Sequence, residues 1–372
     1  MSALRIAMVA GETSGDILGA QVIEALKKRI PNIEFEGVGG PRMIQAGFSS
    51  WFDMERLAVM GLVEPLKRLP ELLSMRKQLK QHWLKHPPNL FLGIDAPDFN
   101  LNIEIALKAQ GIPTAHLVCP TVWAWREGRV KTIAKACDDL LCLFPFEPRS
   151  FEGTKVRAHF VGHPMVEALE ELPSDVDIRT ALHVGDERVL ALLPGSRRSE
   201  IESLLPIYLE ALELCDFPHD IVIPASNSAN LDLIQSVVGT FSIKPRVAIG
   251  GSRELLKVAE LAIVTSGTAT LEAALLDCPM VISYRMSPVS WFFIKRLLKT
   301  KFAGLPNIML GRAVVPELIQ QELTPRALAN ELQVLMGPGA LAQKDAFKEI
   351  LSALDTRFGD QCASVLVNTL GG

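Results

Sequence analysis

Residues 4–19 read LRIAMVAGETSGDILG. An apolar run comes first, a Gly-rich turn follows, and apolar residues then recur at helical spacing. This order is typical of a β-strand that turns directly into an α-helix, as in a Rossmann-like βα unit. Backbone N–H groups at such a helix start can bind an anion or sugar hydroxyls. The pattern therefore favours an α/β fold. The turn is not a GxGxxG motif, so it does not indicate a dinucleotide.

Two interpretations of this turn remain open. Thr13 or Ser14 can simply cap the helix. Alternatively the turn contacts a ligand, because the carboxylates of Glu12 and Asp16 lie beside it. The contact residues of that second interpretation are Gly11, Ser14, Gly15 and Asp16.

The same strand-and-helix alternation continues through most of the chain. A first set of short apolar runs occupies residues 4–9, 33–37, 90–94, 114–118, 140–143 and 159–161. A second set occupies residues 189–193, 221–224, 246–249, 261–264 and 280–284. Amphipathic stretches separate most of these runs, which predicts βαβ units and two mostly parallel sheets.

The chain length supports two domains, because 372 residues suit two α/β domains better than one. We expect one Rossmann-like domain over residues 1–164 and a second over 187–340, joined within 162–186 by an exposed connection that carries a short helix. Residues 341–372 have a helical pattern, and these helices either complete the second domain or cross back onto the first.

Composition excludes several classes of protein. With 48% hydrophobic and 22% charged residues, the chain is a globular protein, and its net charge of -4 argues against nucleic acid as a partner. The six cysteines form no CxxC pair, which favours reduced thiols. The first residues are typical of a strand rather than a signal peptide, and no long apolar window spans a membrane. We therefore expect a cytoplasmic protein.

Two carboxylates follow an apolar strand in the stretch GIDAPDFN, residues 93–100. The carboxyl edge of an open α/β sheet is where such folds bind ligands. Asp98 can be a helix cap and Asp95 can satisfy loop amides. Alternatively, one of them is a general base that takes a proton from a hydroxyl group.

The second half of the chain contains two strand-turn-helix stretches suited to phosphate. In LLPGSRRSE, residues 192–200, Ser196 and Arg197 lie at a helix start, where a guanidinium is well placed for a diphosphate. In TSGTATLEA, residues 265–273, the second phosphate contact comprises Ser266, Gly267, Thr268 and Ala269. Glu272 follows within reach of a ribose. The DxD at 175–177 lies in the connection, so we expect no metal site and no cofactor.

Six strings together resemble the lipid A disaccharide synthases of Gram-negative bacteria. They are AGETSGD (10–16), GIDAPDFN (93–100), VWAWR (122–126), LPGSR (193–197), SGTA (266–269) and LPN (305–307). The resemblance covers nearly the whole chain in order. It implies a GT-B fold, with two Rossmann-like domains facing a central cleft, an acceptor and lipid side in the first domain and UDP-sugar binding in the second.

The resemblance also implies an activity and roles for the residues. An inverting enzyme of this family joins UDP-2,3-diacylglucosamine and 2,3-diacylglucosamine 1-phosphate into a β(1→6) disaccharide 1-phosphate and releases UDP. Asp98 is the expected base, with Glu12 or Asp95 as the second choice. Arg197 and the amides of 266–269 hold the diphosphate, Glu272 the ribose, and Asn307 the donor or the domain interface. The alternatives are another UDP-sugar enzyme of this fold, an epimerase or a glycosyltransferase, or a non-catalytic lipid- or nucleotide-binding protein.

Diacylated substrates imply a membrane surface as a partner. Leucines at 62, 66, 69, 72, 73 and 79, with Trp83, recur at roughly helical spacing beside an excess of Lys and Arg. We expect Leu66, Leu69, Leu72 and Leu73 to contact the inner face of the cytoplasmic membrane, with a helix that starts near Pro70. The alternative is an ordinary helix that buries the stripe on its own sheet. The oligomeric state, including a homodimer, stays open.

Overall fold

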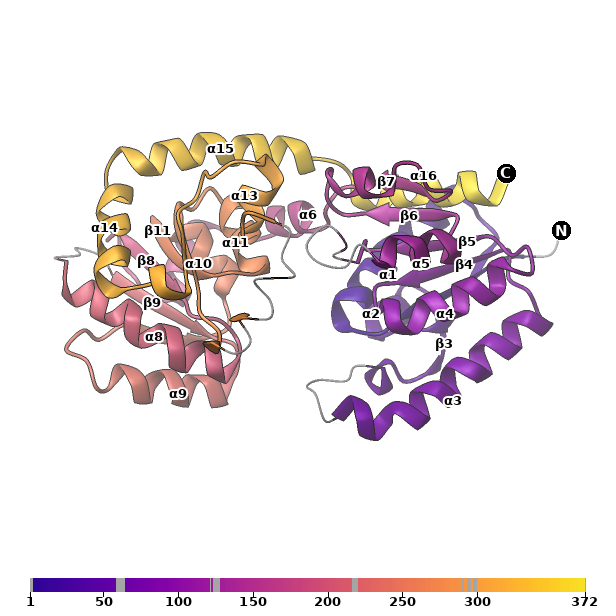
Figure 1. Ribbon diagram of the computed structural model, residues 1–372, viewed down its shortest axis with the longest axis horizontal. Helices are drawn as coiled ribbons and strands as arrows, with labels where there is room; N and C mark the ends of the chain where they lie inside the picture. The colour runs from indigo at the N-terminus through magenta and orange to yellow at the C-terminus, as the bar shows by residue number, and fades with distance from the viewer. Residues whose placement is uncertain are drawn as a thin grey trace. The chain divides into compact units, whose positions relative to one another are not determined.

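The computed structural model describes residues 3–57, 64–120, 122, 128–215, 220–288, 291–292, 296 and 300–371. Its contacts divide the chain into two compact units, of which unit 1 is Met1–Pro164 with Asp355–Gly372 and unit 2 is Met165–Leu354. Each unit is built on a parallel sheet covered by helices (Figure 1). The predicted α/β class with two parallel sheets is confirmed.

Unit 1 has a seven-stranded sheet in the order β3-β2-β1-β4-β5-β6-β7. The strands are β1 (Leu4–Ala10), β2 (Ile33–Val38), β3 (Ser49–Phe52), β4 (Leu90–Ile94), β5 (Thr114–Leu117), β6 (Asp139–Cys142) and β7 (Arg157–Phe160). The helices are α1 (Thr13–Arg29), α2 (Pro41–Gln45), α3 (Glu64–Lys85), α4 (Pro97–Lys108), α5 (Gly128–Ala136) and α16 (Phe358–Gly371), with 3-10 turns η1 (Met54–Arg56) and η2 (Glu147–Phe151). This doubly wound order places the central strands β1 and β4 at the topological switch point.

Unit 2 has a six-stranded sheet in the order β10-β9-β8-β11-β12-β13. The strands are β8 (Val189–Leu193), β9 (Asp220–Ala225), β10 (Arg246–Ile249), β11 (Leu261–Thr265), β12 (Met280–Tyr284) and β13 (Glu317–Ile319). The helices are α6 (Met165–Glu170), α7 (Asp175–Ala181), α8 (Arg198–Glu213), α9 (Ser228–Val238), α10 (Ser252–Val258), α11 (Thr268–Leu275), α13 (Leu305–Leu310), α14 (Pro325–Leu335) and α15 (Pro338–Leu354), with the 3-10 turn η3 (Gln320–Glu322).

Strand β1 shows why these runs form buried strands. Successive side chains point to opposite faces of a sheet, so an apolar residue at every position fills two cores. Ile6 and Met8 pack in the core beneath α1 and α16, whereas Ala7 and Val9 pack in the core beneath α3 and α4. Both cores of unit 1 therefore depend on one continuous apolar run.

Helix α3 differs from the predicted segment in two ways. It begins at Glu64 and continues through Pro70, although we expected the proline to mark a helix start. Leu79 and Trp83, which we assigned to the lipid-facing stripe, are fully buried together with Met75 and pack on the sheet. These three residues are spaced by four and anchor one face of the helix, so a single missing N–H at Pro70 does not end it.

The stretch between the two predicted domains carries two short helices, and most of its residues after Leu169 are exposed. It contains α6 and α7, and Ile178 is buried on unit 2. Lys257 of α10 donates to the carbonyl of Pro173 at 2.7 Å, and Arg179 donates to the carbonyl of Val258. The connection therefore belongs to unit 2, which begins at Met165.

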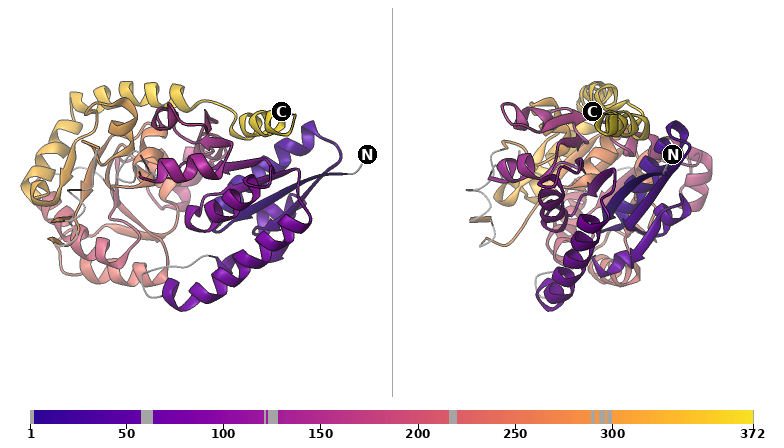
Figure 2. Two further views of the ribbon diagram at one scale, coloured as in Figure 1. Left: turned by 45° about the vertical axis from the view of Figure 1, so that its right-hand side comes forward. Right: turned by 90° about the vertical axis from the view of Figure 1, so that its right-hand side faces the viewer.

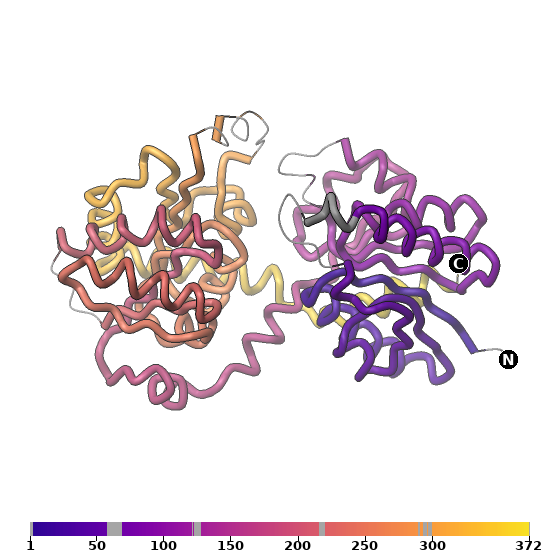
Figure 3. The backbone as a smooth tube through the Cα atoms, turned by 90° about the horizontal axis from the view of Figure 1, so that it is seen from below, coloured from indigo at the N-terminus to yellow at the C-terminus, as the bar shows by residue number. Residues whose placement is uncertain are grey.

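The two C-terminal helices have different destinations. Helix α15 packs on α11, α13 and α14 in unit 2, whereas α16 packs on α1 in unit 1. Figure 3 shows the chain passing from unit 1 into unit 2 and returning, and Figure 2 shows the last helix against the strands that carry the N-terminus. Phe358, Cys362 and Leu366 form a buried face of α16 at a spacing of four residues. Unit 1 is thus closed by residues from the end of the chain.

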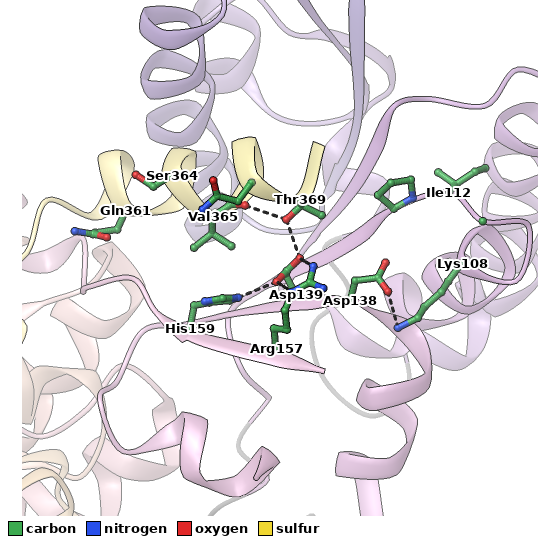
Figure 4. A pocket seen from close by; sticks show the side chains of 13 residues that line it. Lys108, Ile112, Asp138, Asp139, Arg157, His159, Gln361, Ser364, Val365 and Thr369 are labelled. Carbon is green, nitrogen blue, oxygen red and sulfur yellow. Dashed lines mark hydrogen bonds and ion pairs between the residues drawn. The ribbon is translucent and has the colours of Figure 1, made fainter. Parts of the chain in front are cut away.

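A buried carboxylate fastens α16 to the sheet (Figure 4). Asp139, at the start of β6, accepts hydrogen bonds from Thr369 of α16 at 2.7 Å, from His159 at 2.8 Å and from both Nε and Nη2 of Arg157. Burial alone raises the pKa of Asp139, but the bonds from His159, Arg157 and Thr369 outweigh it and lower the pKa to about 2. This cluster lines a hollow of about 800 Å³ between α16 and the amino ends of the strands.

Thr369→Val tests this fastening. We expect α16 to lose about 1–3 kcal/mol of local stability, because a hydrogen bond to a charged group is lost, although Oδ2 of Asp139 keeps its second donor, Arg157. Faster hydrogen exchange in peptides spanning 358–371 reports the loss. Because the folded-state pKa of Asp139 lies below its ordinary value of 3.8, its contribution is complete above about pH 4 and disappears as the pH falls through 2.

Thr356→Val is the matched control. The Thr356 hydroxyl is buried and has no hydrogen-bond partner among the described residues, so the same substitution there removes no bond. Equal exchange in the two variants would contradict the assigned role of Asp139.

Candidate active site

The ligand-binding edge of each sheet follows from the strand order. Strands β1 and β4 are parallel neighbours in unit 1, and β8 and β11 are parallel neighbours in unit 2. Parallel neighbours end at the same edge, so the loops that follow them lie together. The polar stretches predicted as site residues occupy these loops.

In unit 1 the loops after β1 and β4 touch. A Cβ placed on Gly11 would lie 3.2 Å from the Cβ of Ala96, so the two turns are in van der Waals contact. Glu12 is the exposed N-cap residue of α1, and its side chain makes no capping bond. The helix begins at Thr13, so neither Thr13 nor Ser14 is its N-cap. The carboxylate of Glu12 thus lies outside the helix. It is at the same edge of the sheet as the loop that carries Asp95.

Asp98 lies in the first turn of α4, with its side chain 86% exposed. Its Oδ1 accepts a hydrogen bond from Arg129 of α5 at 2.7 Å, and its backbone carbonyl accepts one from Arg76 of α3. Among the described residues, no donor forms a hydrogen bond with Oδ2, which faces solvent. Asp98 therefore has an oriented carboxylate with one oxygen able to accept a proton.

Asp95 lies nearer the sheet, and its backbone conformation is unusual. Its φ is 49°, and that of Ala96 is 43°, both in the left-handed region that residues with a Cβ rarely adopt. The N–H of Asp95 donates to the carbonyl of Leu117, and its carbonyl accepts from Asn100 at 2.8 Å. The surrounding bonds hold this strained loop in place.

The side chain of Asp16 is bonded to backbone groups of α2, although we predicted that it contacts a ligand. It is buried, and its carboxylate accepts the N–H groups of Arg42 at 3.0 Å and Met43 at 2.9 Å in the first turn of α2. These bonds satisfy donors that a helix start leaves unpaired. Gly11 and Gly15 are buried at the same turn, whereas Ser14 is exposed.

In unit 2 the structure brings six predicted binding residues into one pocket of about 380 Å³. They are Ser196 and Arg197 after β8, and Ser266, Gly267, Thr268 and Ala269 after β11. The N-termini of α8 and α11 therefore meet at this pocket, so two sets of helix-start N–H groups belong to one site.

Arg197 is positioned by its own helix. Its Nη1 donates to Glu200 Oε1 at 2.6 Å, and its backbone N–H donates to Glu200 Oε2, which forms a capping box at the start of α8. The hydrogen bond and charge of Glu200 raise the pKa of Arg197. Gly195 makes this return possible, because its φ is +103° and a Cβ there would lie 2.3 Å from the Glu200 carboxylate. The guanidinium is 75% exposed and stays cationic.

The side chains of Glu272 and Asn307 are already hydrogen-bonded to other residues of unit 2. Glu272, in α11, is buried and accepts from Arg253 of α10 at 2.8 Å. Asn307 is 1% exposed; its Oδ1 accepts from the N–H groups of Val314 and Val315, and its Nδ2 donates to Val315 and Glu317. These bonds hold the chain that leads to β13, and the expected contact of Asn307 with the donor or the domain interface stays a prediction.

One described cluster brings possible metal donors together. Cys119, Cys142 and Glu147 are buried, with donor atoms within 4.8 Å of one another. The hydrogen bond to Cys119 and burial raise the pKa of Cys142 well above its ordinary value, and all three residues are buried. Glu147 also accepts the N–H of Phe144. We assign the cluster a packing role.

Part of the first-unit site lies outside the described residues, namely Trp123, Trp125 and Arg126 of the VWAWR string. Among the described residues, no helix has the length and apolarity needed to cross a bilayer.

Comparison with known proteins identifies the family. The family profile described as lipid-A-disaccharide synthetase matches residues 6–363. A lipid-A-disaccharide synthase of Saccharophagus degradans is 48% identical over 344 residues, covering 90% of this chain and 89% of that protein. One of Pseudomonas putida strain GB-1 is 43% identical over 374 residues, covering 100% and 99%. The chain belongs to the lipid-A-disaccharide synthetase family. It is a hexosyltransferase of lipid A synthesis, as the resemblance predicted.

Solved structures with a similar fold support the GT-B assignment. UDP-GlcNAc 2-epimerase from Neisseria meningitidis aligns with a TM-score of 0.65 at 14% identity over 99% of both chains. MurG from Acinetobacter baumannii aligns with a TM-score of 0.58 at 12% identity, also over 99% of both. At this identity the likeness concerns the fold alone, which is GT-B as predicted, and the family matches do not favour the epimerase alternative.

The pocket of this hexosyltransferase contains residues that the sequence analysis did not single out. Ser226 follows β9, while Gly250 and Ser252 follow β10, and all three line the pocket beside Arg197. Asn230 donates to the carbonyl of Ser196 at 2.8 Å and to the hydroxyl of Ser226. The turn strings PASNSAN and IGGSREL at the ends of predicted strands were the available signal.

Gly195→Ala tests the capping geometry of this pocket. We expect unit 2 to lose about 1–3 kcal/mol of stability, because alanine is strained at φ +103° and its Cβ displaces Glu200. Urea unfolding followed by circular dichroism measures the loss. Gly185→Ala is the control, since a Cβ at Gly185 has no atom within 4 Å. Similar unfolding midpoints in both variants would refute the argument.

Proposed function

We propose that this enzyme transfers a 2,3-diacylglucosamine unit from its UDP derivative to the 6-hydroxyl of 2,3-diacylglucosamine 1-phosphate. The product is the β(1→6) disaccharide 1-phosphate, and UDP is released. The observation that carries the proposal is the family match together with the two polar edges, one with the exposed carboxylate of Asp98 in unit 1 and one with Arg197 and two helix N-termini at the pocket of unit 2.

The proposed reaction is one direct displacement. The acceptor oxygen forms a bond to the anomeric carbon as the bond from that carbon to the donor phosphate oxygen breaks, which inverts the α-linked donor. The acceptor hydroxyl gives its proton to Asp98, whose Oδ2 faces solvent while Arg129 orients Oδ1. Glu12 and Asp95 are the alternative proton acceptors.

The diphosphate in this proposal is held by unit 2. Arg197 and the N–H groups of residues 266–269 bind the phosphates, and they stabilise the negative charge that grows on UDP as it leaves. Glu272 binds the ribose hydroxyls after exchanging part of its contact with Arg253. This arrangement supplies the positive charge from protein groups, with no metal ion or cofactor in the proposal.

We also propose that the enzyme works at the inner face of the cytoplasmic membrane, because both substrates carry two acyl chains. Leu69 and Leu73 of α3 are 46% and 44% exposed, and Leu72 between them is half-buried. Lys77, one turn further along, is exposed as well. Apolar side chains beside basic ones are typical of a surface that binds anionic lipid. The side chain of Leu66 lies outside the described residues.

Asp98→Asn tests the assigned base. We expect kcat to fall by about 10² to 10⁴, because the amide keeps the shape of the carboxylate and cannot accept the proton. UDP affinity, measured by calorimetry, should stay within about twofold, since the UDP pocket is in the other unit. UDP release from diacylated and unacylated substrates is the assay, and only the diacylated pair should react.

Three further variants complete this test. Asp95→Asn and Glu12→Gln identify the base if Asp98→Asn keeps normal turnover, which would contradict the assignment. Asp232→Asn, an exposed carboxylate on α9, is the control and should change neither quantity.

Leu69→Ser with Leu73→Ser tests the membrane surface. We expect sedimentation with phosphatidylglycerol vesicles to fall at least tenfold, because two exposed apolar side chains are lost from the interface. Leu351→Ser is the control, as Leu351 of α15 is 41% exposed in unit 2. Unchanged vesicle binding, with an unchanged circular dichroism spectrum, would rule out this surface.

A further inference from the structure

A charged pair lies buried directly beneath the loop that carries Asp95 and Asp98. Glu104 of α4 and His116 of β5 are both 0% exposed, and His116 Nδ1 lies 2.6 Å from Glu104 Oε1. The proposed chemistry makes no direct use of either side chain. Burying two ionisable groups is unfavourable, and their pairing only partly offsets the lost hydration.

The pair packs against β4, the strand that precedes the loop of residues 95–98. Gly93 of β4 is in register with His116 of β5, and it immediately precedes the end of the strand. A Cβ on Gly93 would lie 2.1 Å from Glu104 Oε1 and 3.0 Å from both His116 Nδ1 and the Cβ of Asn100. The glycine of the GIDAPDFN stretch is therefore needed for space: only a residue without a side chain lets the pair reach the strand.

Asn100 connects the pair to the strained loop. It lies one helical turn before Glu104 on α4, and its Nδ2 donates to the carbonyls of Asp95 at 2.8 Å and Val9 at 3.2 Å. The same buried face of α4 thus contacts the loop, the end of β1 and the pair, while the exposed side of its first turn carries Asp98. Displacing Glu104 would rotate or shift the helix that orients Asp98.

Stability alone is a poor explanation for this cluster. Among the described residues, His116 Nε2, Glu104 Oε2 and Asn100 Oδ1 are buried without a hydrogen-bond partner. Each unpaired buried polar atom lowers the stability of the folded state, so an apolar core would be more stable at this place. Buried charged groups that lower stability are concentrated at functional sites.

The charges around His116 come from three elements. Glu104 faces it from α4 and Asp95 from the loop after β4, while Cys137 at the end of α5 lies near Glu104. Burial alone lowers the pKa of His116, but the charge and hydrogen bond of Glu104, with a smaller effect of Asp95, outweigh it and raise the pKa. Burial raises the pKa of Cys137, so it stays a thiol, and Lys108 is occupied by the Cys137 carbonyl and Asp138.

We propose that Glu104 and His116 are a positioning pair for the proposed reaction: beneath the loop of residues 95–98, they hold α4 in register and keep the loop in place. The imidazolium is the member whose charge interacts with Asp95, and this interaction is reciprocal. The inference rests on the proposed function, since it assigns the pair to the proton acceptor of that reaction.

The test compares the pH dependence of kcat/KM for UDP release in four variants. They are Glu104→Gln, His116→Gln, the double variant Glu104→Gln/His116→Gln, and the control Ile103→Val. In the first three the imidazolium is lost, so the acid limb of the profile should move up by about half a pH unit, which is about threefold in kcat/KM on that limb. Ile103→Val removes one buried methyl group from the same helix and should leave the limb in place.

The double variant separates positioning from packing. Its two amides can hydrogen-bond to each other, so its unfolding midpoint should exceed those of both single variants, while its acid limb stays shifted. A limb that returns to the wild-type pH together with the stability would show a merely structural pair and overturn the proposal. An unshifted limb in all three variants would overturn it as well.

A second readout does not depend on turnover. The imidazole titration of His116, followed by NMR, should move to lower pH in Asp95→Asn, because a carboxylate that stabilises the imidazolium is lost. An unchanged titration would overturn the positioning pair. Absence of UDP release by the wild-type enzyme would instead defeat the proposed function, and the His116 titration would still decide the coupling.

Discussion

Parallel alignment of neighbouring strands is the constraint on which the rest of this molecule depends. Because every strand pair in both sheets is parallel, each strand delivers its following loop to the same edge. The stretches around Asp95 and Glu12 become neighbours for this reason, although more than 80 residues of chain separate them. In unit 2 the same constraint brings the helix starts at Arg197 and Thr268 to one pocket. Local chemistry then needs only suitable residues at the strand ends.

The polar residues at these edges divide into two groups by their hydrogen bonds. Asp16 and Asn307 have their side chains occupied by backbone groups, and they fix the turns on which neighbouring residues lie. Asp98 keeps an oxygen toward solvent, and Arg197 keeps a guanidinium that is largely exposed. A binding site needs residues of both kinds. Exposed polar side chains can contact a ligand, and they are held accurately only when the backbone that supports them has few other conformations.

In both units, a glycine near the end of a strand makes room for a supporting carboxylate. Gly93 and Gly195 each leave room for a carboxylate that returns to the strand end, Glu104 in one case and Glu200 in the other. In unit 1 the returning carboxylate meets a buried imidazole, and in unit 2 it meets the exposed guanidinium of Arg197. A glycine at the end of a strand therefore marks the approach of a charged side chain as well as a turn.

The sequence by itself determined the class of the fold, the positions of the buried strands and the family, because continuous apolar runs and turn strings are local signals. The short edge strands β3 and β13 were not predicted, since neither has an apolar run and each is defined by its neighbour. Only the tertiary structure decided that Leu79 and Trp83 face the core while Leu69 and Leu73 stay exposed, because helical spacing alone does not say which side meets the sheet. It also decided the destination of α16, whose Thr369 meets Asp139 across 230 residues of chain, a distance at which no local pattern carries information.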